Sequence, residues 1–222
     1  MTKKRYVARF FNWFVKFTGF PLYFIVARPK IYYEDKSVQS RRIRGKAIVI
    51  SNHTSVWDIG FMIFVFPFRT LRCIIADIMY QKNPVLTLFL KSIGGIKVER
   101  EAHNFAFIQK SCDILDKGGV IEIYPEARIP QPGEETPLEF KPSSAYIAVS
   151  SGAPIIPVYI DGKYFTKERA CAIIGKSIDV SSLYDHSLSE QENLKLITEK
   201  LRDKVVELKN ELNSKKNKQQ GK

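Results

Sequence analysis

The sequence predicts an α/β fold, in which a single domain with a central, mostly parallel or mixed sheet flanked by helices follows an N-terminal amphipathic helical hairpin. From residue 41 onward, short β-branched runs alternate with stretches of helical periodicity, as in α/β domains. Residues 1–30 are instead basic and strongly aromatic. The hydrophobic content of 45% supplies a core and excludes global disorder.

Six β-branched runs predict the strands, at 47–51, 71–76, 96–99, 120–124, 155–161 and 170–174. Five periodic stretches predict the helices, at 56–66, 84–92, 104–117, 143–151 and 190–213. The last helix has the clearest signals, because Ser189 and Glu192 form a capping box and an apolar stripe runs from Leu194 to Leu212. We therefore place the domain at 31–213 and a disordered basic tail at 214–222, which lacks apolar residues.

Positive charge is concentrated at the N-terminus. Residues 1–50 hold twelve Lys or Arg against two acidic residues, a net of +10 out of +12 for the whole chain. Such a basic end attracts polyanions, either nucleic acid or an anionic membrane surface.

The N-terminal segment has the pattern of a membrane-surface helix. Its polar residues form one narrow stripe at helical spacing, and they are Arg5, Arg9, Asn12 and Lys16. The rest of the helix surface is apolar and mostly aromatic, so we expect the stripe to face lipid phosphates with the aromatic rings below. Docking of this helix on the protein's own core is the alternative. Nucleic acid fits less well and is not expected, because the apolar surface is continuous.

We expect Gly19 and Pro21 to interrupt this helix and a second apolar stretch at 22–27 to complete the hairpin. The longest uncharged run, 17–27, has eleven residues, whereas a spanning helix needs about twenty. Residues 1–30 are therefore predicted to associate with the membrane as a peripheral or monotopic element.

Three cysteines, Cys73, Cys112 and Cys171, lie far apart in the sequence. Their number and spacing predict packed free thiols in a reducing compartment, with no disulfide scaffold or zinc site. No metal or redox cofactor is expected.

A histidine and an aspartate follow the predicted strand 47–51. On one helix, His53 and Asp58 would point about 140° apart, but a turn after the strand allows the carboxylate to reach the imidazole. A carboxylate on one ring nitrogen fixes the tautomer and leaves the other nitrogen basic. This is the logic of a hydrolase triad without its serine, so the substrate would supply the hydroxyl. Taken alone, the pair is also compatible with a structural histidine.

Charged side chains also end two later strands. Arg100 follows the strand at 96–99 and is suited to bidentate phosphate binding. Glu126 and Arg128 follow the strand at 120–124. Each of these residues has an ordinary alternative, a surface arginine in one case and a local ion pair in the other.

Four segments in this order resemble the motif blocks of the glycerolipid acyltransferase family, in particular its bacterial 1-acylglycerol-3-phosphate acyltransferases. They read N-H-T-S-V-W-D, G-I-K-V-E-R, Y-P-E-A-R and A-P-I-I-P-V. The resemblance covers about residues 47–175 and implies a glycerol-3-phosphate acyltransferase-like fold. It implies acyl transfer from an acyl thioester, carried by coenzyme A or acyl carrier protein, to lysophosphatidate. The product would be phosphatidate, made at the cytoplasmic face of the cell membrane.

The resemblance also assigns roles to residues. His53 falls on the family's catalytic base and Asp58 on its orienting carboxylate. Arg100 falls on the arginine that binds the acceptor phosphate, and Glu126 on the glutamate near the acceptor's glycerol. The fourth block, around Pro154 and Pro157, resembles the part that shapes the apolar donor side.

The third block departs from the family's usual Phe-Pro-Glu-Gly-Thr-Arg. Here Ala127 replaces a glycine whose backbone freedom the fold uses, and Arg128, a second candidate phosphate ligand, comes one residue early. The acceptor therefore stays open between lysophosphatidate, glycerol 3-phosphate and an aminolipid. A non-catalytic basic membrane-binding protein is the alternative from another class.

Overall fold

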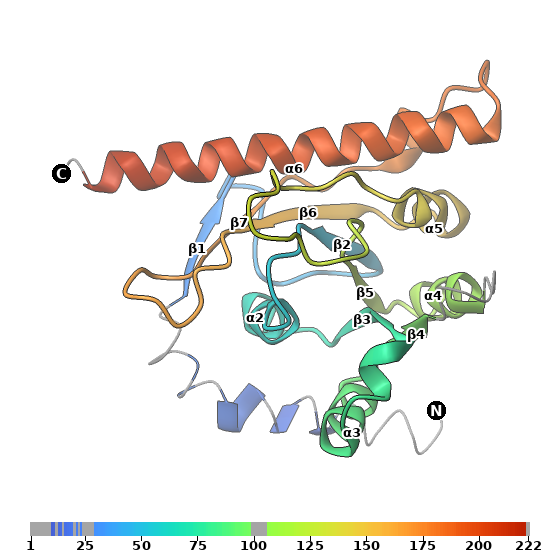
Figure 1. Cartoon of the computed structure of the whole chain (residues 1–222). Helices are drawn as coiled ribbons and strands as arrows, with labels where there is room; N and C mark the ends of the chain where they lie inside the picture. The colour runs from blue at the N-terminus through green and yellow to red at the C-terminus, as the bar shows by residue number, and fades with distance from the viewer. Residues whose placement is uncertain are drawn as a thin grey trace.

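The chain forms one seven-stranded sheet with helices on both faces, which confirms the predicted fold class (Figure 1). This computed structural model describes residues 10–11, 13–14, 16–19, 21, 23, 29–98 and 106–220.

The strands lie in the order β1-β7-β6-β2-β5-β3-β4. They are β1 (Lys30–Tyr33), β2 (Ala47–Ser51), β3 (Leu71–Ala76), β4 (Ile96–Val98), β5 (Val120–Ile123), β6 (Ile155–Ile160) and β7 (Cys171–Ile174). All neighbouring pairs are parallel except β6 and β7, which are antiparallel. The sequence predicted six of these strands to within one residue at each described end. It did not predict β1, a four-residue strand whose pairing partner β7 lies far along the chain.

The helices are α2 (Asp58–Val65), α3 (Pro84–Ser92), α4 (Ala106–Asp116), α5 (Ser143–Ser151) and α6 (Glu190–Gln220), with short 3₁₀ turns η1 (Asp77–Tyr80) and η2 (Val180–Leu183). The bounds of α3 and α5 are those predicted. The predicted capping box of α6 forms, with the Ser189 backbone N–H donating to Glu192 Oε2 at 2.9 Å.

The prediction of a disordered tail from residue 214 is wrong as far as residue 220, because α6 continues to Gln220. Two lysines of this extension hold it to the sheet. The Lys215 ammonium donates to the Tyr33 carbonyl at 2.7 Å, and Lys216 Nζ lies 3.0 Å from Asp161 Oδ2. Residues 221–222 lie outside the described part of the chain.

Alternate residues of the central strand β2 point to opposite faces, and each face has its own core. Ile48 and Ile50 pack with the buried stripe of α6 and with α5. Ala47 and Val49 pack with Phe61 and its neighbours on α2. Figure 1 shows α6 along one side of the sheet and α2 on the other. The central strand β2 is thus packed against helices on both faces of the sheet.

Every described residue from 10 to 23 is helical, Gly19 and Pro21 included, whereas residues 20 and 22 lie outside the described part, so the predicted interruption stays a prediction. Most of the second apolar stretch, 22–27, lies outside the described residues. Within the part of the chain that the structure covers, no helix is both long enough and apolar enough to cross a bilayer.

Lys16 points toward the protein, contrary to the predicted orientation of its stripe. Its ammonium donates to the carbonyls of Pro67 at 3.0 Å and Arg69 at 2.5 Å, just beyond the end of α2. Burial lowers the pKa of Lys16 to about 8. Arg5, Arg9 and Asn12 lie outside the described residues.

Candidate active site

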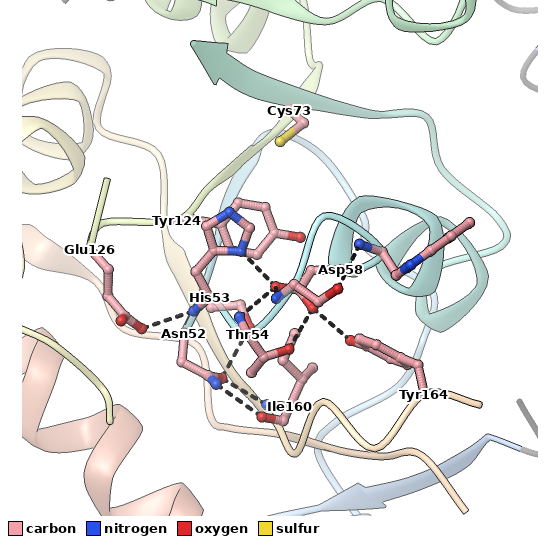
Figure 2. Close-up of polar contacts among 12 residues, drawn as sticks. Asn52, His53, Thr54, Asp58, Cys73, Tyr124, Glu126, Ile160 and Tyr164 are labelled. Carbon is pink, nitrogen blue, oxygen red and sulfur yellow. Dashed lines mark hydrogen bonds and ion pairs between the residues drawn. The ribbon is translucent and has the colours of Figure 1, made fainter. Parts of the chain in front are cut away.

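The site lies where parallel strands end at one edge of the sheet. In α/β sheets, the loops that follow the carboxyl ends of the strands form the usual ligand site. Here β2 leads into His53, β5 leads into Tyr124 and Glu126, and β6 leads into the loop that carries Tyr164. Residues distant in the sequence therefore meet at this edge (Figure 2).

His53 and Asp58 form the predicted dyad. The turn after β2 brings His53 Nδ1 to 2.6 Å from Asp58 Oδ2. Asp58 is the first residue of α2, where a helix N-terminus favours negative charge. No group in the described part of the chain hydrogen-bonds to His53 Nε2, and 17% of the histidine side chain is exposed. Nε2 is thus the nitrogen available to a substrate.

Five donors surround the fully buried Asp58 carboxylate (Figure 2). Besides His53 Nδ1, Oδ2 accepts the backbone N–H groups of Thr54 at 2.6 Å and Ser55 at 2.9 Å. Oδ1 accepts the Thr54 hydroxyl at 2.7 Å and the Tyr164 hydroxyl at 2.9 Å. These hydrogen bonds offset the desolvation of a buried charge and fix the direction from which the carboxylate meets the imidazole.

The loop after β6 closes over the dyad. Gly162 has a φ of +67°, and a Cβ at this position would lie 2.5 Å from the Thr54 hydroxyl oxygen, so only glycine allows this approach. The loop then delivers the Tyr164 hydroxyl to Asp58, and burial raises the pKa of that hydroxyl. The Tyr164 ring also packs against Phe61 of α2, with ring centroids 5.2 Å apart.

A second buried carboxyl group lies behind the histidine ring. Tyr124 stacks on His53 with centroids 4.4 Å apart and planes 20° apart. The Tyr124 hydroxyl donates to Glu122 Oε1 at 2.6 Å, whereas Glu122 Oε2 has no hydrogen-bond partner in the described structure. Burial raises the pKa of Glu122 to about 8. The imidazole is therefore held at its edge by Asp58 and at its face by Tyr124.

Glu126 ties two loops together. Its Oε1 accepts the His53 backbone N–H at 2.8 Å, and its Oε2 accepts the Leu138 backbone N–H at 3.0 Å. The side chain is 3% exposed, and burial raises its pKa. In this structure Glu126 positions the backbone of His53; the predicted contact with the acceptor's glycerol stays a prediction.

Arg128 points to a different partner from the one predicted. It forms a bidentate pair with Glu134, with N–O distances of 2.6 and 2.7 Å, and it is solvent-exposed. Its guanidinium would have to leave Glu134 to bind phosphate. Ala127 adopts a φ of +58°, which confirms that this position of the third block uses the left-handed conformation that glycine favours.

Arg100, the predicted phosphate ligand, lies outside the described residues. The strand before it, β4, ends at Val98 and runs parallel to β3. Pro157 of the fourth block lies within β6, next to Ile50 of β2. Neither observation tests the predicted role in substrate binding.

Sequence reasoning missed several residues that build the site. Asn52 and Thr54 could have been found, because both lie in the polar turn next to His53. Asn52 exchanges two hydrogen bonds with the backbone of Ile160, at 2.8 and 2.9 Å. Tyr164 gave no signal, since nothing local links it to Asp58. Glu122 lies within a predicted strand, where a charged residue is usually exposed, but here it is buried.

The three cysteines are free thiols, as predicted; Cys73 and Cys171 are buried. Cys73 is the register partner of Glu122 in the neighbouring strand, and burial raises its pKa well above the usual value. The protonated thiol is a packing group here.

Comparisons with known proteins match this chain to acyltransferases. A 1-acyl-sn-glycerol-3-phosphate acyltransferase of Bacillus subtilis (strain 168) is 29% identical over 136 residues, 59% of this chain and 65% of that protein. The chain thus matches less than two thirds of the length of this relative. The crystal structure of the 1-acyl-sn-glycerophosphate (LPA) acyltransferase PlsC from Thermotoga maritima is similar in fold. It has a TM-score of 0.61 at 23% identity and covers 93% of this chain and 81% of that one.

The sequence model of the Acyltransferase family matches residues 30–161, more than half of the chain. This range contains β1 through β6 and both members of the His53–Asp58 dyad. The chain belongs to the Acyltransferase family.

Proposed function

We propose that this protein transfers a fatty acyl group from an acyl thioester to the sn-2 hydroxyl of 1-acylglycerol 3-phosphate, giving phosphatidate for phospholipid synthesis. The observation that carries the proposal is the 2.6 Å contact between His53 Nδ1 and Asp58 Oδ2, which leaves Nε2 basic at the end of β2. Membership of the Acyltransferase family supports it. The name of the Bacillus subtilis relative supports the choice of acceptor.

The proposed reaction is a direct transfer with His53 as general base. Nε2 takes the proton of the acceptor hydroxyl while that oxygen attacks the thioester carbonyl. The tetrahedral intermediate then collapses, the C–S bond breaks, and the departing thiolate takes the proton from Nε2. Asp58 holds the tautomer that keeps Nε2 unprotonated and stabilises the imidazolium while it exists.

Acceptor binding requires a cation for the phosphate. Arg100 is our first choice, because it comes soon after the end of β4 in the sequence, as predicted for the phosphate ligand. Arg128 is the second, provided that it exchanges Glu134 for phosphate. Holding the acceptor by its phosphate would turn a bimolecular encounter into an oriented reaction at Nε2. Glu126 supports the His53 backbone and, in this proposal, also borders the glycerol.

We further propose that the protein acts at the cytoplasmic face of the cell membrane. Phe10, Trp13, Phe14 and Phe17 of the N-terminal helix are exposed, and we call them the aromatic face. Exposed aromatic rings on a basic segment are typical of helices that lie in the headgroup region. Lysophosphatidate and phosphatidate are both amphiphiles, so this position would let them reach the site without leaving the bilayer.

A turnover assay of the full chain tests the reaction. The wild type and His53→Ala are given acyl-coenzyme A or acyl carrier protein thioester, with lysophosphatidate, glycerol 3-phosphate or an aminolipid as acceptor. We expect phosphatidate from lysophosphatidate, and a loss of roughly 10²–10⁴-fold in the variant. His186→Ala, on the loop before α6, is the matched control and should keep full activity. Equal rates for His53→Ala and wild type would reject the mechanism.

Fluorescence tests the membrane contact, because the chain has two tryptophans, Trp13 and Trp57. In Trp57→Phe, bilayer-embedded bromolipids should quench Trp13. In Trp13→Phe, the remaining Trp57 reports whether the site itself touches lipid. Unquenched Trp13 in vesicles that bind the protein would contradict the role of the aromatic face.

A further inference from the structure

Helix α3 exposes large apolar side chains that nothing in the described structure covers. Val85 is 75% exposed and Leu88 is 66% exposed, whereas Leu90 on the opposite side is buried at 2%. Residues on a helix are about 100° apart, so Val85 and Leu88 lie together on the outer side. Leu86 and Leu90 attach the inner side to the core beside Tyr124. The helix is therefore apolar on its solvent-facing side as well as on the side that packs against the core.

This outer side adjoins the aromatic face. Phe89 of α3 makes an edge-to-face contact with Phe11 of the N-terminal helix, with centroids 6.5 Å apart. Figure 1 shows α3 and the blue N-terminal helical residues along the same edge of the molecule, with α6 on the far side of the sheet. The exposed apolar surface thus spans two helices from separate parts of the chain.

The charges around α3 are positive. Lys82 lies just before the helix and Lys91 in its last turn; both are exposed, and neither forms an ion pair with a residue in the described ranges. The nearby acid, Asp77, is neutralised by Lys97, with Lys97 Nζ 3.2 Å from Asp77 Oδ2. Exposed apolar side chains flanked by unpaired lysines match the headgroup region of an anionic bilayer, where the lysines can reach lipid phosphates.

We propose that α3 is a second membrane-contacting element, with Val85 and Leu88 inserted among the lipids and Lys82 and Lys91 at the phosphates. The occupant of this surface is an anionic lipid bilayer. The inference deepens the proposed function and rests on its membrane location. η1 and α3 follow the carboxyl end of β3, and the dyad follows the carboxyl end of β2, at the same edge of the parallel sheet. Lipid contact at α3 therefore places this edge, and the dyad with it, next to the membrane surface.

Vesicle partitioning of the full chain tests this proposal. The variant Val85→Asp/Leu88→Asp is compared with Val38→Asp/Leu188→Asp, which adds the same charge at exposed apolar positions outside α3. On vesicles of phosphatidylcholine with phosphatidylglycerol, we expect the α3 variant to bind at least about tenfold more weakly, and the control to bind like wild type. Unchanged partitioning of the α3 variant would overturn the proposal.

A second variant separates the two contributions. Lys82→Ser/Lys91→Ser should weaken binding to anionic vesicles by about fivefold per lysine and leave binding to pure phosphatidylcholine unchanged. Equal binding of this variant and wild type to anionic vesicles would reject the role of the lysines. If α3 instead joins two copies of the chain, Val85→Asp/Leu88→Asp would turn a dimer into a monomer at unchanged vesicle binding, which also rejects the proposal.

Activity in solution distinguishes this inference from the proposed function. With short-chain lysophosphatidate and short-chain acyl-coenzyme A, both monomeric in water, Val85→Asp/Leu88→Asp should turn over like wild type. Loss of that activity together with a lower melting temperature would show damage to the fold, and the lysine variant then decides. If wild type itself makes no phosphatidate, the proposed function fails while the vesicle comparison still stands.

Discussion

Two of the buried carboxyl groups near His53, those of Asp58 and Glu122, are held in opposite ways. Asp58 receives five hydrogen bonds, two of them from backbone N–H groups, and sits at the start of α2. Glu122 receives one, from Tyr124, and leaves Oε2 without a partner in the described structure. Burial is complete for both. Because the two groups are equally buried, the number of hydrogen-bond donors, and not the depth of burial, distinguishes them. A buried carboxyl group with few donors, such as Glu122, resists ionisation.

The largest effect is expected at the well-satisfied carboxylate. Asp58→Asn should lower turnover by roughly 10²–10⁴-fold, because an amide can bond the wrong tautomer and cannot stabilise the imidazolium. The measurement is the turnover assay with acyl thioester and lysophosphatidate, with vesicle binding recorded in parallel and expected to be unchanged. Asp113→Asn, at an exposed position of α4, is the matched control. Turnover within a few-fold of wild type would show that the donors around Asp58 serve only stability.

Glu122 should show its effect in the pH dependence of stability. Folding raises its pKa from 4.5 to about 8, so between these values the folded state binds more protons than the unfolded state. The free energy of unfolding should therefore fall as pH rises through this window, by on the order of 4 kcal/mol from this group.

Urea unfolding of wild type, Glu122→Gln and Glu122→Leu near pH 5 and near pH 9 measures this contribution. Both variants should lose less stability than wild type between the two conditions, since neither has a carboxyl group to ionise. If both variants lose as much stability as wild type between the two pH values, another group titrates, and the proposed difference between Glu122 and Asp58 is wrong.

A smaller effect is expected from removing one of the five donors. Tyr164→Phe should reduce kcat by about tenfold with KM unchanged, since one hydrogen bond to a charged group is lost. Tyr146→Phe, on the outer side of α5, provides the control. A lower melting temperature for Tyr164→Phe at unchanged kcat would assign Tyr164 a purely structural role.

The smallest effect concerns the backbone beside Glu126. Ala127→Gly should relieve left-handed strain of about 1–2 kcal/mol, less about 0.4–1 kcal/mol for the freer unfolded chain. The expected net gain of up to about 1.6 kcal/mol is measured by thermal unfolding, with Ala153→Gly as a control at a buried position without positive φ. A lower melting temperature for Ala127→Gly than for wild type would contradict the strain.

Local patterns predicted most of the elements but not the surfaces that they cover. The apolar stripe of α6 and the apolar residues of α3 have similar helical spacing. Leu201 on α6 is buried against the sheet, whereas Leu88 on α3 is exposed. Periodicity reports which residues share a face of a helix, and only the packed chain determines whether protein covers that face. For the same reason, helical spacing placed Lys16 in a stripe predicted to face lipid, whereas the packed chain turns this lysine toward the protein.

The sequence by itself determined six of the seven strands, the dyad and the order of the motif blocks, because each depends on residues within a few positions of one another. Only the tertiary structure decided that Tyr164 reaches Asp58 across 106 positions and that Glu126 supports the His53 backbone. It also decided that Arg128 binds Glu134. The contacts of Tyr164 and Glu126 arise where parallel strands from separate segments end together, and such long-range meetings leave no local pattern in the chain.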